Sequence, residues 1–287
     1  MLPQIIGNSI ITGSIYSVIA FGFTIMYSTM GFFNMAYGAN ILTGAYVFFV
    51  FYRLLNLPLM VAVVISLVLT AALMSVIDRL SYYKLRNKRV PSWTIVVVSI
   101  SVNLIIESAI SMIFGSRTRV VYPTIPKVFN IFGASITSIQ IAVFAVSLLV
   151  MIATHLFLKK TKMGKIIRAL SNDRTMSSVV GIDVEQVFLI VTVVVSMLAT
   201  AAGIFSALDT DIRPRMGSAV MLKAITCSIV GGVGNIRGAM IAAFLFAVIE
   251  TAITFLIGSG WKDGFSLLVV IVLMLVSPKS FGLPQKN

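Results

Sequence analysis

The chain has 287 residues, of which 59% are hydrophobic, and its mean hydropathy is +1.04. This composition excludes a water-soluble domain, and the continuous apolar runs exclude an outer-membrane barrel, whose strands would alternate apolar and polar residues. The net charge of +13 does not indicate a nucleic-acid partner, because Lys and Arg collect in the cytoplasmic loops of membrane proteins. The sequence therefore predicts an all-α, polytopic integral membrane protein that has membrane lipid as part of its solvent.

In chain order, the apolar runs predict about eight or nine transmembrane or re-entrant helices. The seventh run is short and interrupted by glycine, so it is either a full span or a broken, re-entrant helix. Because no linker or low-complexity stretch divides the chain, residues 1–287 are expected to form one transmembrane domain. The runs cover residues 5–29, 35–52, 58–77, 92–114, 136–158, 186–207, 217–233, 238–257 and 264–277.

Basic residues predict the orientation of these helices. Loops 78–91 and 159–185 hold five and six Lys or Arg, whereas loop 115–135 between them holds three. The positive-inside rule then places the first two loops in the cytoplasm and the third outside. Two spans separate the two cytoplasmic loops, so the assignments agree, and the N-terminus is expected outside. The first basic residue is Arg53, so no cleaved signal peptide is predicted.

The segment 159–185 is long and polar between two apolar runs. Its pattern predicts two short helices, with Asp173 as the N-cap of the second and Gly181 just after its end. Two such helices with apolar faces are typical of a surface that docks another protein, while the alternative is a loop that only binds lipid headgroups. The apolar faces comprise Ile166, Ile167 and Leu170 in the first helix and Met176, Val179 and Val180 in the second.

Motifs of catalysis are missing from the sequence. It contains no GxxxxGK[ST] phosphate loop and no HExxH, CxxC or GxSxG, so an enzyme with its own ATPase activity is not predicted. Cys227 is the single cysteine, which rules out a disulfide within the chain, and the single histidine, His155, is read as an interfacial residue. The carboxylates are scattered, so we expect no metal site and no cofactor.

Two groups of polar residues are candidates for a translocation pathway. Asn34, Tyr37 and Asn40 are spaced to share one helical face in an interrupted, charge-free segment. Amides and a phenol are costly to turn toward lipid, so they face either a water-lined path or a helix break that they cap. The ionisable residues inside predicted spans either face the same path or pair internally. They are Glu107, Lys223 and Glu250.

Three stretches resemble one known family, in the family's order. They are GSIYSVIAFGFTIMYSTMGFFNMAYGANILTGAY (Gly13–Tyr46), TKMGKIIRALSNDRTMSSVVGID (Thr161–Asp183) and RPRMGSAVMLKAITCSIVGGVGNIRGAMIAAFLFAVIE (Arg213–Glu250). They are similar to the permease subunits of bacterial ABC importers for branched-chain amino acids, specifically the shorter of the two permeases that pair there. The family usually has His and Glu where this chain has Tyr37 and Asn40. That departure leaves urea, amides or another small solute open as the substrate.

The resemblance implies a multi-pass permease of the bacterial inner (plasma) membrane, driven by ATP hydrolysis on other subunits. Its implied partners are two ABC ATPase subunits, a second permease subunit and a periplasmic or lipid-anchored solute-binding protein. A secondary transporter or channel that works alone is the competing hypothesis. In the importer, segment 159–185 would be the coupling loop that docks on an ATPase. Its expected contributors are Gly164 and Gly181 for turns, Ile166, Leu170 and Val179 as apolar anchors, and Arg168 and Asp173 as polar contacts.

Overall fold

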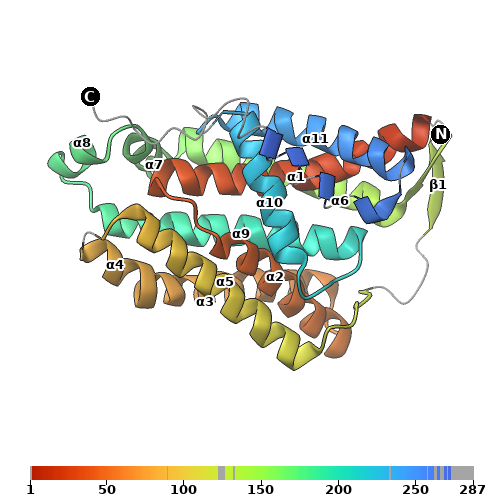
Figure 1. Cartoon of the computed structure of the whole chain (residues 1–287), viewed down its shortest axis with the longest axis horizontal. Helices are drawn as coiled ribbons and strands as arrows, with labels where there is room; N and C mark the ends of the chain where they lie inside the picture. Colours follow the sequence, from red (N-terminus) through yellow and green to blue (C-terminus); the bar gives the residue numbers. More distant parts are fainter. Residues whose placement is uncertain are drawn as a thin grey trace.

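The computed structural model describes residues 2–88, 90–121, 127–131, 133–232, 234–256, 258–261, 264–265, 268–269 and 271–272. Most of them form helices that run side by side along the length of the molecule (Figure 1). The α-helices are α1 (Leu2–Met30), α2 (Ala36–Phe49), α3 (Leu59–Ile77), α4 (Tyr83–Asn87), α5 (Ser92–Phe114), α6 (Ser138–Lys160), α7 (Lys162–Asn172), α8 (Arg174–Val179), α9 (Val184–Asp209), α10 (Met216–Val230) and α11 (Ile236–Leu256). Two π-helical segments, η1 (Val50–Leu54) and η2 (Asp78–Tyr82), continue α2 and α3, and a 3₁₀ turn, η3, covers Ser259–Trp261.

The prediction of a polytopic helical membrane protein is confirmed. Within the described residues, six helices are long and apolar enough to cross a membrane. They cover Leu2–Met30, Leu59–Asn87, Ser92–Phe114, Ser138–Lys160, Val184–Asp209 and Ile236–Leu256. The seventh predicted run forms α10, whose 15 residues rise only about 22 Å, short of the ~30 Å hydrocarbon layer. The predicted run 264–277 lies mostly outside the described residues.

Helix α1 is the centre of the core. It packs against α6, α9, α10 and α11, and its buried side chains include Val18, Phe21 and Phe23. α2 lies between α9, α5, α3 and α10, so α9 contacts both of the first two helices. The chain order of the helices is therefore not their order in space. The late helices α10 and α11 pack against α1, the first helix of the chain.

The loops gather at two opposite ends of the molecule (Figure 1). One end, here called the basic end, holds α4, α7 and α8. The N-terminus and a two-stranded hairpin lie at the other, with β1 (Val128–Ile131) paired antiparallel to β2 (Ala134–Thr137). Gln4 Nε2 donates to the carbonyl of Ser135 at 3.0 Å, which ties α1 to this hairpin. Helices α4, α7 and α8 come from the two loops predicted to be cytoplasmic, and the hairpin comes from the loop predicted to be outside, so their placement at opposite ends agrees with the predicted orientation. The hairpin itself was not predicted from the sequence.

Candidate functional site

The break between α1 and α2 positions the first candidate site. Gly31 has a φ of +63°, the left-handed conformation that commonly ends helices, and its N–H donates to the carbonyl of Tyr27 at 2.8 Å. The chain then bends at Phe32 and turns at Met35, which already has α-helical dihedral angles, before α2 begins at Ala36. Asn34 holds that start, because its Oδ1 accepts from Ala36 N at 3.0 Å.

Asn34, Tyr37 and Asn40 line one small cavity of about 30 Å³ between α1, α2, α3, η2 and α9. Tyr37 Oη donates to the carbonyl of Ile19 at 3.0 Å. Asn40 Nδ2 donates to Ser196 Oγ at 2.8 Å, while Asn40 Oδ1 is buried without a hydrogen-bond partner among the described residues. The three residues that sequence spacing placed on one face therefore do share one site.

Residues from other helices complete this cavity, and the sequence analysis missed them. Tyr82 reaches it from the π-helical segment η2, and its Oη donates to Asn34 Oδ1 at 3.2 Å. Thr192 and Ser196 reach it from α9. No local pattern marked these side chains, because single hydroxyls are common in membrane helices. All eleven residues that line the cavity are uncharged: Met26, Asn34, Ala36, Tyr37, Asn40, Met74, Ile77, Tyr82, Thr192, Val195 and Ser196.

Lys223 and Glu250 lie apart from this cavity, in contact with each other. Lys223 Nζ donates to Glu250 Oε1 at 2.6 Å and to Tyr16 Oη at 2.9 Å, and Tyr16 Oη donates to Glu250 Oε1 at 3.1 Å. Lys223 is 4% exposed and Glu250 1%. The cluster joins α1, α10 and α11. Of the two roles weighed for these residues, the structure favours internal pairing, because a charge buried this deeply needs a partner.

Glu107 belongs to a third cluster, where α5 meets the start of α10. Ser218 Oγ donates to Glu107 Oε2 at 2.8 Å, and Asn103 Nδ2 donates to Ser218 Oγ at 3.1 Å. The side chain of Arg215 lies 3.8 Å from Glu107 but is almost fully exposed, so this ion pair is weak. Close by, the backbones of Gly38 and Gly217 approach so closely that a Cβ on Gly217 would collide with the carbonyl of Gly38.

The polar segment forms the two predicted short helices, α7 and α8. Thr161 caps α7, with its Oγ1 accepting from Gly164 N at 2.9 Å. Asp173 caps α8, with its Oδ1 accepting from Met176 N at 3.0 Å, and Gly181 has a φ of +89°. The predicted N-cap and the predicted left-handed glycine are both confirmed. Arg168 is exposed on α7.

Two expectations for this segment need correction. Leu170 is buried at 1% exposure in the chain's own core, so it does not present an apolar anchor to a partner; Ile166 is half-buried against the same core. Gly164 does not form a turn but lies inside α7, where a Cβ would collide with the carbonyls of Phe157 and Leu158. The apolar face of α7 therefore packs on the end of α6 and on α1, while Val179 on α8 remains 77% exposed.

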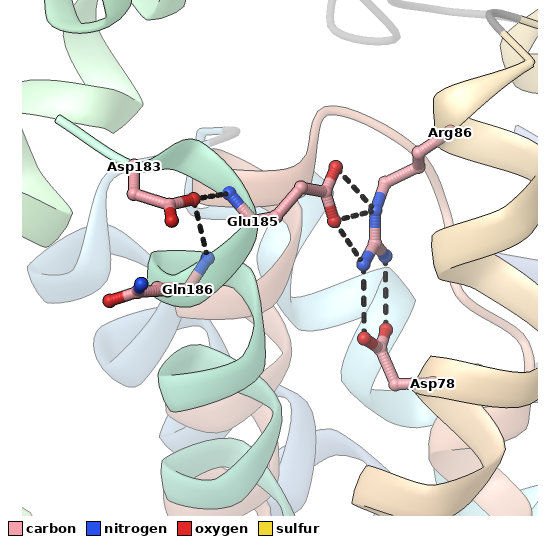
Figure 2. A network of polar contacts seen from close by, with 5 residues as sticks. All are labelled: Asp78, Arg86, Asp183, Glu185 and Gln186. Carbon is pink, nitrogen blue, oxygen red and sulfur yellow. Dashed lines mark hydrogen bonds and ion pairs between the residues drawn. The ribbon is translucent and has the colours of Figure 1, made fainter. Parts of the chain in front are cut away.

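A charged network at the basic end joins η2, α4 and α9 (Figure 2). Arg86 Nη1 and Nη2 donate to the two oxygens of Asp78 at 3.0 Å each, and Arg86 Nε and Nη2 donate to Glu185 Oε2 at 3.0 and 2.8 Å. One guanidinium thus holds two carboxylates, a geometry that suits arginine and not lysine. Asp183 caps α9 beside them. An open cavity of about 460 Å³ adjoins the network.

Comparison with known proteins decides the family. A family model described as "branched-chain amino acid transport system / permease component" matches residues 5–277. The chain belongs to this family. The motif resemblance drawn from the sequence is therefore confirmed, and the chain is a transport permease subunit.

Individual relatives are similar over almost their whole length. The chain is 29% identical to the high-affinity branched-chain amino acid transport system permease protein LivH of Escherichia coli (strain K12), over 97% of this chain and 94% of that protein. It is 30% identical to the permease protein BraD of the corresponding system of Pseudomonas aeruginosa, over 95% and 93%. Among solved structures, PsaBC from Streptococcus pneumoniae in complex with Fab is 15% identical, with a TM-score of 0.49 over 97% of this chain and 91% of that one.

Proposed function

We propose that this permease subunit translocates branched-chain amino acids, or a related small solute, across the bacterial inner (plasma) membrane as part of an ABC importer. The family match over residues 5–277 carries the proposal. The near-complete coverage of the relatives supports the extension to their solute class, since both relatives are named for branched-chain amino acid transport. ATP hydrolysis takes place on partner subunits, and residues 1–287 act as one permease domain.

The partners in this proposal are two ABC ATPase subunits, a second permease subunit and a periplasmic or lipid-anchored solute-binding protein. Segment 159–185 is the coupling loop on the cytoplasmic side. Its ATPase contact is the exposed surface of α8, with Val179 as the central apolar residue and Arg168 and Asp173 as polar neighbours. Met176 and Val180 extend this surface, because both are largely exposed on or just after the same short helix.

The solute path passes the cavity at Asn34, Tyr37 and Asn40. α2 and α10 lie within the membrane beside the six long helices, which makes eight, and the predicted run 264–277 is the ninth. The uncharged lining favours a solute that needs no fixed charge at this point. That observation supports a second candidate function, transport of urea, amides or another uncharged small solute.

Uptake into vesicles tests the proposed function. The permease would be reconstituted with its ATPases, partner permease and binding protein, and uptake of labelled leucine, isoleucine and valine would be compared with that of urea and acetamide. We expect uptake of the three amino acids only when ATP and the binding protein are both present. Uptake of urea or acetamide alone would support the second candidate, and uptake without the ATPases would contradict both.

The Asn40→Leu variant tests the path itself. The leucine keeps the branched shape beside Ser196 but is larger and removes both polar atoms, so transport is expected to fall while expression and binding-protein affinity stay unchanged. The control is Ser66→Ala on α3: among the described residues, this buried hydroxyl bonds only to the carbonyl of Ala62, within its own helix turn. If both variants transport equally well, Asn40 serves packing rather than the path.

A further inference from the structure

One arginine connects the exposed helix α8 directly to the end of α1. Arg174 is the first residue of α8, and its Nη2 donates to the carbonyl of Thr29 at 2.7 Å. Thr29 lies in the last turn of α1, where backbone carbonyls have no partner within the helix and a cation is favourable. A second contact lies beside it, since Thr29 Oγ1 is 3.2 Å from Ser171 Oγ on α7. α7 and α8 are therefore both linked to the end of α1 by side-chain hydrogen bonds.

Gly31 shows how closely the arginine approaches the break. A Cβ built on Gly31 would collide with the guanidinium of Arg174. Gly31 is also the left-handed residue that ends α1, and the non-helical residues 32–35 follow it. Arg174 thus lies against Gly31, the residue at which the chain leaves α1 and turns toward Asn34. Since Asn34 lines the candidate path, Arg174 contacts the segment that leads into that path.

A second route runs from Arg174 through an aromatic ring. The guanidinium carbons of Arg174 and Arg86 lie 5.5 and 5.0 Å from the centre of the Phe188 ring. Both distances are within the range of cation–π attraction, which holds two like charges near one another. Burial, and then the charge of Arg86, lower the pKa of Arg174. The two arginines and Phe188 thus form one packed unit at the basic end.

From Arg86 the contacts lead back to the cavity. Arg86 is bidentate to Asp78, the first residue of the π-helical segment η2, and Tyr82 is the last residue of that segment. Tyr82 Oη donates to Asn34 Oδ1 in the cavity wall. π-helical turns inside longer helices often occur at functional sites. Both routes from α8, through Thr29 and through Phe188, therefore end at residues 31–35.

We propose that Arg174 is a positioning residue for transport: it transmits movement of α8 to the break at residues 31–35, and so couples the ATPases to the cavity beside Asn34. This inference rests on the proposed importer function and names the residues through which coupling passes. Arg174 acts through Thr29 and Phe188 and does not itself touch the solute path.

The test measures solute taken up per ATP hydrolysed by the complete importer in vesicles, normalised to the amount of assembled complex. In Arg174→Gln this ratio is expected to fall about ten-fold, because a charge-assisted hydrogen bond is lost. ATP hydrolysis without solute should stay within about two-fold of wild type, because the residues named for the ATPase contact, with Val179 at their centre, are all unchanged in this variant. Arg174→Lys keeps the charge and a donor but not the planar group, so we expect a loss of only about three-fold.

The matched control is Lys84→Gln, which removes an exposed positive charge from α4 at the same end. Its uptake per ATP should equal that of wild type. The inference is overturned if Arg174→Gln keeps the wild-type ratio, or if uptake and hydrolysis fall by the same factor. If the wild-type complex shows no ATP-driven uptake, the proposed importer function fails instead, so the two failures are distinguishable.

A pair of substitutions tests the contact at Gly31. Gly31→Ala should lower uptake per ATP in the wild-type background, because its Cβ meets the Arg174 guanidinium. In an Arg174→Ala background the same change should add less than about a two-fold loss, because the obstacle is gone. Backbone strain at the positive φ is present in both backgrounds and cancels. Equal effects of Gly31→Ala in the two backgrounds would overturn the proposed contact.

Discussion

Helices α1 and α5 are both long and apolar enough to span a bilayer, but their surroundings differ. In the apolar stretch of α1, 89% of the residues are buried in the protein, against 22% in α5. The more buried helix is nevertheless the less apolar of the two. In a water-soluble protein the opposite would hold, since burial there selects for apolar side chains.

The difference follows from the solvent of each helix. A helix face that is open to hydrocarbon carries large aliphatic groups, and the exposed face of α5 has such residues, for example Leu104 and Ile105. A helix enclosed by other helices gains instead from small residues and interhelical hydrogen bonds. α1 has buried Ser14, Ser17 and Thr24, and its Gly13 lies directly against Phe244 of α11. In α1, low hydropathy thus accompanies burial inside the protein.

The largest test of this comparison removes the buried cation beside α1. Lys223→Met leaves Glu250 as an uncompensated charge and should lower the free energy of unfolding by about 3–5 kcal/mol. The double variant Lys223→Met with Glu250→Leu should recover most of that loss, because both charges are gone. Unfolding in mixed micelles titrated with a denaturing detergent measures both. A double variant as unstable as the single one would contradict a role in pairing.

A smaller loss is expected from Gly203→Ala in α9. A Cβ there would collide with the carbonyl of Ile41, so α2 and α9 would have to separate, at a cost of about 1–3 kcal/mol. Helix propensity alone predicts the opposite sign, because alanine favours a helix over glycine by ~1 kcal/mol. The sign of the change in the same unfolding assay therefore decides whether close packing controls this helix.

The next effect concerns a hydrogen bond between α1 and α10. Thr24 Oγ1 lies 3.1 Å from Ser228 Oγ, and Thr24→Val removes this contact at nearly constant volume. Interhelical hydrogen bonds in membranes average about 0.6 kcal/mol, and a loss of that size is expected. The control is Ser101→Val on the exposed face of α5, where the free energy of unfolding should not fall. A loss at Ser101 as large as that at Thr24 would refute the distinction between the two helices.

The smallest effect is predicted on the open face of α5. Ile105 is 67% exposed, so Ile105→Ala should change the free energy of unfolding of the isolated permease by no more than about 0.5 kcal/mol. The same variant measured in the assembled importer sharpens the comparison. If Ile105→Ala lowers the free energy of unfolding by more than about 1 kcal/mol only in the assembled importer, another subunit rather than lipid covers this face of α5.

Much of this architecture was predictable from local sequence. Continuous apolar runs indicated the long helices, because each such helix satisfies its own backbone within one segment. The caps at Asp173 and Gly181 were predictable for the same reason, since a cap depends on three or four neighbouring residues. The spacing of Asn34, Tyr37 and Asn40 placed them on one face, and the structure brings them to one cavity.

Only the tertiary structure decided which distant residues meet. Asn40 bonds to Ser196, 156 positions away, and Lys223 pairs with Glu250, 27 positions away; neither pairing leaves a periodic signal. Leu170 shows the same limit, because an amphipathic pattern identifies an apolar face but not what covers it. Leu170 is buried in the chain's own core, while Val179 is exposed. Hydropathy records how each residue interacts with solvent, whereas contacts between helices depend on how several helices pack at once.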